Sequence, residues 1–204
     1  MVLSAYCLGC FATGYYLVRW RTGQDLRELG SGNVGARNAG RVLGWRGFVL
    51  TLAGDFAKGA LAVWGAAQLS PEEPVVTLAL LAVVAGHIWP AQLRFRGGKG
   101  LATSLGGLVA YDFRLALTFG LLFAGGWALL RRTVLPGLLA VACLPLASTF
   151  LASDAPFATQ CFRVLALAVL AGLVLTAHRH NLLAEFVHLL ERRHAHSKPE
   201  RDES

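Results

Sequence analysis

The segment Val75–Ala91, VVTLALLAVVAGHIWPA, contains no Lys, Arg, Asp or Glu. A transmembrane helix needs about 20 predominantly apolar residues, and this segment approaches that length. The rest of the chain has the same character, because 55% of its 204 residues are hydrophobic and only 15% are charged. A soluble domain averages about 25% charged residues. The sequence therefore predicts an all-α integral membrane protein.

Apolar runs separated by polar or basic segments continue on both sides of this stretch. The sequence predicts seven spans, at Val2–Val18, Gly47–Leu69, Val75–Leu93, Leu101–Tyr111, Leu115–Leu130, Val134–Leu151 and Val164–Ala177. The fourth span is short and rich in Gly, Ala, Ser and Thr, so we expect it inside the bundle, where small residues allow close helix approach. Residues 152–163 are expected to form a weakly polar connection.

The distribution of basic residues predicts the orientation, because Lys and Arg collect on the cytoplasmic side of membrane proteins. The net charge is +7, and most of the basic residues lie at 19–46, 94–99, 131–132 and after His178. If all four segments face the cytoplasm, seven crossings are needed, with the N-terminus outside and the C-terminus inside. We expect a single transmembrane domain over residues 1–193 and a polar, disordered tail over residues 194–204.

Several other classes of protein are poorly supported. No basic helix or aromatic-interleaved patch stands apart from the membrane segments, so we expect no nucleic-acid partner. Cys7 and Cys10 have CxxC spacing but lie in the first apolar run without two further ligands nearby, so we expect no metal. The N-terminus lacks the basic region of a signal peptide, so we expect the first helix to stay in the membrane.

A glycine-rich, basic segment, SGNVGARN at residues 31–38, runs on to Arg41. Its glycines, Gly32 and Gly35, permit backbone conformations that point amides at a ligand. Its neutral hydrogen-bonding side chains are Ser31, Asn33 and Asn38. Its cations, Arg37 and Arg41, can each grip a phosphate through two N–H groups. An ordinary cytoplasmic loop whose arginines only orient the protein is the alternative.

A second basic segment, GGKGLATS at residues 97–104, leads into the short fourth span. It would place glycines and hydroxyls at a helix N-terminus, where free amides and the helix dipole attract anions. Lys99 adds a full charge. The segment is not a nucleotide-binding P-loop, because its glycine spacing is wrong and Lys99 is followed by Gly rather than Ser or Thr. The alternative is a positive-inside anchor with a flexible turn.

Further polar groups lie within or at the ends of the apolar runs. His87 lies late in the third span, where an imidazole is costly unless it is hydrogen-bonded or faces a polar cavity. Asp55 and Lys58 lie three apart on one helical face, and we expect an ion pair that either holds helices together or closes a site. The final span ends in HRHN at residues 178–181, which offers a base, a phosphate clamp and an orienting amide, or a plain basic helix exit.

In this order, the segments resemble the signatures of the bacterial PlsY family, the acyl-phosphate:glycerol-3-phosphate acyltransferases. The first is SGNVGARN followed by RVLG at residues 41–44, the second runs from GHIWP at residues 86–90 to Thr103, and the third is HRHN. Gly54–Gly59 fits the second helix of the family. The resemblance covers about residues 8–181, nearly the whole chain.

The chain departs from the family pattern in three places. Arg37 stands where a Thr is usual, and Cys10–Thr13 replaces a stretch of small residues and Pro. Leu182–Glu185 lacks the basic residues common after the third signature. These differences bear on acceptor preference and activity level more than on the fold.

The resemblance implies a seven-helix enzyme of the bacterial inner membrane, with its active site facing the cytoplasm. It would transfer a fatty acyl group from acyl phosphate to the sn-1 hydroxyl of glycerol 3-phosphate, giving lysophosphatidic acid and phosphate, as the first step of phospholipid synthesis. Its partners would be both substrates and membrane lipid, with no acyl-CoA, no metal and no other cofactor.

The resemblance also assigns residues to roles. Substrate binding would fall to Ser31, Gly32, Asn33, Asn38, Arg41, His87, Gly97, Gly98, Lys99, Gly100, Thr103, Ser104 and Arg179. Catalysis would fall to Lys99, His178 and Asn181. Direct attack by the substrate hydroxyl is favoured over an acyl-enzyme, because no Ser or Cys nucleophile with a base partner is apparent. His178 is a candidate base, and a substrate or leaving phosphate is the alternative proton acceptor.

Two other functions share some of these features. An organophosphate or anion transporter would also present basic, glycine-rich sites, but those sites usually lie near the membrane midplane, often in paired repeats. No convincing internal repeat is evident in this sequence. A catalytically inactive relative that acts as a structural partner is the third possibility. The His-x4-Asp pattern of other acyltransferases is not matched.

Overall fold

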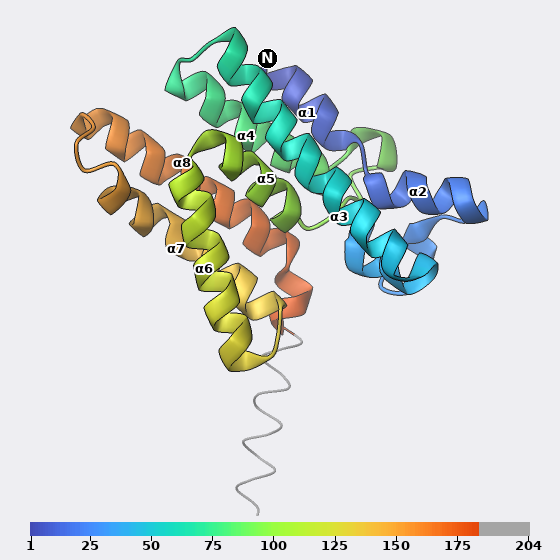
Figure 1. Ribbon diagram of the computed structural model, residues 1–204. Coiled ribbons are helices and arrows are strands. Elements are labelled where there is room, and N and C mark those ends of the chain that lie inside the picture. The colour runs from blue at the N-terminus through green and yellow to red at the C-terminus, as the bar shows by residue number, and fades with distance from the viewer. Residues whose placement is uncertain (184–204) are drawn as a thin grey trace, which may run out of the picture.

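The computed structural model describes residues 1–183, so the predicted tail at 194–204 lies outside the described residues. Within residues 1–183 all of the regular secondary structure is helical (Figure 1). The α-helices are α1 (Val2–Cys10), α2 (Thr13–Thr22), α3 (Ala36–Leu69), α4 (Glu73–Ile88), α5 (Leu101–Tyr111), α6 (Phe113–Leu130), α7 (Val134–Leu151) and α8 (Phe157–Ala177). Two short 3₁₀ turns, η1 (Leu26–Glu28) and η2 (Ala91–Leu93), lie in the connections.

Five helical segments in the described part of the chain are long and apolar enough to cross a membrane. They are Ala36–Leu69, Glu73–Leu93, Phe113–Leu130, Val134–Leu151 and Phe157–Ala177. The short α5 matches the predicted fourth span, Leu101–Tyr111. The all-helical membrane class is therefore confirmed, whereas the seven crossings and the orientation of the termini stay predictions.

The first predicted span, Val2–Val18, is not one continuous helix, so the expectation of a single helix over these residues is wrong. The chain leaves helical geometry at Phe11 (φ −66°, ψ 100°) and Ala12 (φ −85°, ψ 92°), which separate α1 from α2. The carbonyl of Phe11 accepts a hydrogen bond of 2.7 Å from Lys58 Nζ. An irregular backbone inside an apolar bundle needs such a partner, and the partner lies far away in the sequence.

Two other helices begin earlier than the hydropathy predicts. α3 begins at Ala36 rather than Gly47, and a kink at Gly44 (φ 70°, ψ −163°) divides its polar start from its apolar body. α8 begins at Phe157 rather than Val164, so the expected connection at residues 152–163 is partly helical. Arg163 fits into α8 because Glu73 and Asp112 pair with it at 2.6 and 3.2 Å.

The short α5 lies between the N-terminal helices α1, α3 and α4 and the C-terminal helices α6, α7 and α8 (Figure 1). It approaches α3 closely, because a Cβ at Gly59 would overlap the carbonyl oxygen of Thr103, and one at Gly106 would overlap that of Phe56. The expected close packing of small residues in this helix is confirmed. This packing carries the N-terminus of α5 to a defined position, next to the loop that holds Lys99.

Candidate active site

The second and third basic segments meet at Lys99. Lys99 precedes α5, and its Nζ donates a hydrogen bond of 2.7 Å to Oδ1 of Asn181, just after α8. Burial, and then the positive charges of Arg37 and Arg41, lower the pKa of Lys99 from its ordinary value of 10.5. The two arginines belong to the first basic segment, so all three segments lie within electrostatic reach of one ammonium group.

The loop before Lys99 is held by its own backbone. The amide of Gly97 donates to the carbonyl of Ile88 at 3.1 Å, and the amide of Gly98 donates to that of His87 at 2.9 Å. Both amides are therefore engaged within the loop, although Gly97 and Gly98 are among the residues expected to bind substrate. Gly100 (φ 88°) caps α5, and the amides of the first helical turn have no acceptor within the helix.

The first basic segment is organised by Asn38, which is 1% exposed. Its Oδ1 accepts from the amide of Ser31 at 2.9 Å, and its Nδ2 donates to the carbonyls of Leu26 and Leu29 at 3.2 and 2.8 Å. Asn33 likewise accepts from the amide of Gly35 at 2.7 Å. Both asparagine side chains are thus engaged with the backbone of the segment.

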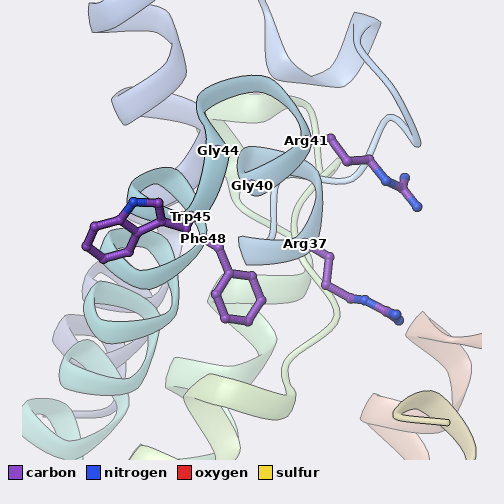
Figure 2. A pocket seen from close by; sticks show the side chains of 6 residues that line it. All are labelled: Arg37, Gly40, Arg41, Gly44, Trp45 and Phe48. Carbon is purple, nitrogen blue, oxygen red and sulfur yellow. The ribbon is translucent and has the colours of Figure 1, made fainter. Parts of the chain in front are cut away.

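A pocket of about 380 Å³ lies beside the kink of α3, and its lining residues are Arg37, Gly40, Arg41, Gly44, Trp45 and Phe48. Figure 2 shows Arg37 and Arg41 projecting to the same side of the helix start, with the Trp45 and Phe48 rings after the kink. The pocket therefore combines two cations with apolar aromatic surface. Arg37, whose charge the sequence offers to a phosphate but which is absent from the expected substrate-binding residues, lines this pocket.

The third basic segment places a neutral imidazole near Lys99. His178 is 3% exposed, and its Nδ1 lies 2.8 Å from the carbonyl of Val174. A carbonyl only accepts, so Nδ1 carries the proton and Nε2 keeps its lone pair when the ring is neutral. Burial, and to a smaller extent the charge of Lys99, lower the pKa of His178 from 6.5. Arg179 is exposed and contacts the ring of His180.

Two expected hydroxyl ligands lie inside the bundle. Thr103 and Ser104 are both 0% exposed, and among the described residues neither hydroxyl has a hydrogen-bond partner. They follow Gly100 on α5, whose N-terminus faces the loop of Lys99. Gly32 (φ 71°) lies in the exposed turn that precedes α3. The structure therefore joins Lys99 to Asn181 by a hydrogen bond and places His178 within reach of the Lys99 charge, whereas the two hydroxyls have no partner among the described residues.

His87 lies in a different environment from Lys99. It is 4% exposed, and its Nδ1 lies 2.7 Å from Lys58 Nζ. The expected ion pair is confirmed, because Lys58 Nζ lies 3.1 Å from Asp55 Oδ1. Thr13, which the sequence did not single out, donates to the same Asp55 oxygen at 3.0 Å. Within the described residues, no group of three His, Cys, Asp or Glu side chains could hold a metal ion.

Known proteins resemble this chain over nearly its whole length. The family model described as glycerol-3-phosphate acyltransferase matches residues 1–186. The glycerol-3-phosphate acyltransferase 1 of Desulfitobacterium hafniense is 48% identical over 89% of this chain and 87% of its own length. The Myxococcus xanthus glycerol-3-phosphate acyltransferase is 39% identical over 90% of this chain and 93% of its own.

Solved structures of an integral membrane protein agree with this relationship. The glycerol 3-phosphate form of PlsY (YgiH) superposes with a TM-score of 0.79 at 33% identity, covering 91% of this chain and 90% of that one. Its lysophosphatidic acid form gives a TM-score of 0.76 at 30% identity, with the same coverage. The chain belongs to the glycerol-3-phosphate acyltransferase family, the PlsY family of multi-pass membrane proteins.

Proposed function

We propose that this chain transfers a fatty acyl group from acyl phosphate to the sn-1 hydroxyl of glycerol 3-phosphate. The observation that carries the proposal is the 2.7 Å bond between Lys99 Nζ and Asn181 Oδ1, with Arg37 and Arg41 acting on the same ammonium. This cluster of charge suits a phosphate group. The named forms of the PlsY structures, glycerol 3-phosphate and lysophosphatidic acid, fit the proposed acceptor and product.

In this proposal Lys99, Arg41 and Ser31 hold the phosphate of glycerol 3-phosphate. The first-turn amides of α5 add hydrogen bonds and the positive end of the helix dipole. Asn38 stabilises the first basic segment rather than contacting the substrate, because its side-chain amide is hydrogen-bonded to the backbone of Leu26, Leu29 and Ser31. The site would face the cytoplasm at the edge of the bacterial inner membrane, where a soluble acceptor meets a membrane-bound donor.

The chemistry is a direct transfer. The sn-1 oxygen forms a bond to the acyl carbonyl carbon, the bond from that carbon to the phosphate oxygen breaks, and phosphate leaves with the bonding electrons. The hydroxyl proton passes to Nε2 of His178, which keeps its lone pair when the ring is neutral, or to a phosphate oxygen. Acyl phosphate is already activated, so positioning and charge stabilisation supply most of the catalysis.

A single assay tests the proposed function. Purified protein in detergent is incubated with acyl phosphate and glycerol 3-phosphate, and the release of phosphate and the formation of lysophosphatidic acid are measured. Release that depends on both substrates is expected. Flux of glycerol 3-phosphate across vesicles without release would indicate a transporter, and the absence of both activities would indicate a structural partner.

A further inference from the structure

Three titratable side chains outside the phosphate site are buried together between α3 and α4. Asp55, Lys58 and His87 are 3%, 4% and 4% exposed. Lys58 Nζ lies 2.7 Å from the carbonyl of Phe11, 3.1 Å from Asp55 Oδ1 and 2.7 Å from His87 Nδ1. An ammonium group has three N–H donors. These three partners use all of them, so the position of Lys58 is determined from three directions.

This geometry determines which nitrogen of the His87 ring carries the proton. An ammonium only donates, so Nδ1 of His87 accepts and the ring proton lies on Nε2. The Nε2 end of the ring is directed at Gly98, because a Cβ built on Gly98 would overlap Nε2 and lie 2.5 Å from Cε1. The imidazole therefore occupies the space that a side chain at Gly98 would need.

The backbone of His87 holds the same loop. Its carbonyl accepts from the amide of Gly98 at 2.9 Å, and a Cβ on Gly97 would overlap that carbonyl. The next residue after Gly98 is Lys99, whose Nζ reaches Asn181. The backbone and the ring of His87 thus contact Gly97 and Gly98, the two glycines that immediately precede Lys99.

We propose that Asp55, Lys58 and His87 are positioning residues for Lys99, acting through the contact of the His87 ring with Gly98. The inference rests on the proposed function of Lys99 in phosphate binding. It replaces the expected role of His87 as a substrate ligand. Loss of the ring contact lets the loop shift, and a shift of about 1 Å at a catalytic group can cost about 100-fold in rate.

A larger residue at position 98, combined with a smaller one at position 87, tests this contact. Gly98→Ala places a methyl group against the ring, and its backbone is outside the left-handed region, so the ring is the main obstacle. His87→Asn keeps an acceptor for Lys58 and removes the end of the ring. We expect Gly98→Ala to raise the KM for glycerol 3-phosphate and lower kcat/KM about 10- to 100-fold. The kcat/KM of the double variant should recover to within about threefold of the value for His87→Asn alone.

Each outcome decides the question. The inference would be overturned if the losses of kcat/KM in the two single variants multiplied in the double variant. A wild-type KM in Gly98→Ala would also overturn it. If Gly98→Ala does not fold, His87→Asn alone is decisive, because an unchanged KM would refute a positioning role even if the melting temperature falls. Gly65→Ala, with no heavy atom within 4 Å of its Cβ, is the matched control. Wild-type activity in Lys99→Ala would instead refute the proposed role of Lys99 itself.

Discussion

Lys99 is the residue at which the charges of the site converge. It is half-buried, hydrogen-bonded to Asn181, and close enough to Arg37 and Arg41 for their charges to lower its pKa. Three cations within electrostatic reach of one another repel unless an anion offsets their charge. A phosphate group would remove that repulsion, which is the physical reason for assigning the cluster to substrate binding.

Replacement of Lys99 by alanine is expected to lower kcat/KM by about 1000-fold or more, because it removes a charge at the proposed, partly desolvated phosphate site. Arg96→Ala is the control, since Arg96 is exposed in the same loop. The kcat/KM of Arg96→Ala should stay within about threefold of the wild-type value if long-range charge has only a minor effect. Phosphate release under single-turnover and steady-state conditions measures both variants.

The folded protein is expected to lose stability when His178 can be protonated. Its pKa is lowered from 6.5 in the folded state, so above that pH the ring is neutral in both states and stability is unaffected. Below about pH 6.5 the unfolded chain binds the proton first, and the folded state is penalised. The melting temperature in detergent should fall more steeply between about pH 7 and pH 5 for the wild type than for His178→Gln. The same dependence of melting temperature on pH in both proteins would contradict this prediction.

At the scale of the element, the kink of α3 sets the direction of its arginines. Gly44 has φ 70° and ψ −163°, a conformation available essentially to glycine alone, and nothing lies within 4 Å of a Cβ built there. The cost of a side chain at this position is therefore conformational. The kink separates the polar start of α3, which carries Arg37 and Arg41, from the apolar body of the helix.

Gly44→Ala is expected to destabilise the protein by about 1–3 kcal/mol, or to straighten α3 and redirect the arginines. The KM for glycerol 3-phosphate should rise in either case. Gly65→Ala in the same helix, with regular helical geometry and open space, should be neutral or stabilising by up to about 1 kcal/mol. Thermal unfolding and substrate titration of the two variants decide the matter.

At the scale of the molecule, a further polar cluster joins α4, α8 and the junction between α5 and α6, at the end of α5 opposite Lys99. Arg163 on α8 pairs with Glu73 on α4 at 2.6 Å and with Asp112 before α6 at 3.2 Å. Tyr111 donates to Glu73 at 2.8 Å. α5 has 11 residues, so the two ends are about 16 Å apart.

Arg163→Met is expected to lower the free energy of unfolding by about 1–3 kcal/mol, because it leaves two carboxylates without their shared partner. Activity below the melting temperature should be retained, since the cluster is remote from Lys99. Arg114→Met is the matched control, because Arg114 pairs with the same Asp112 but its side chain is 59% exposed. Equal loss of stability in both variants would contradict a specific role for Arg163.

Much of the fold could be predicted because hydropathy is a local property. The short helix Leu101–Tyr111 and the span Val134–Leu151 agree with the structure at both ends. The break at Phe11 and the early start of α8 could not be predicted, because each depends on a partner that is distant in sequence. The cost of a polar group in an apolar bundle depends on that partner and not on its neighbours along the chain.

Contiguous residues are enough to predict the membrane class, the three basic segments and the family they indicate. The folded chain is needed to see that Lys99 reaches Asn181 across 82 positions and that the His87 ring lies against Gly98. It also showed that Asn38 holds its own segment. Hydrogen bonds act over about 3 Å in space, so the folded chain alone determines which polar groups can share one site.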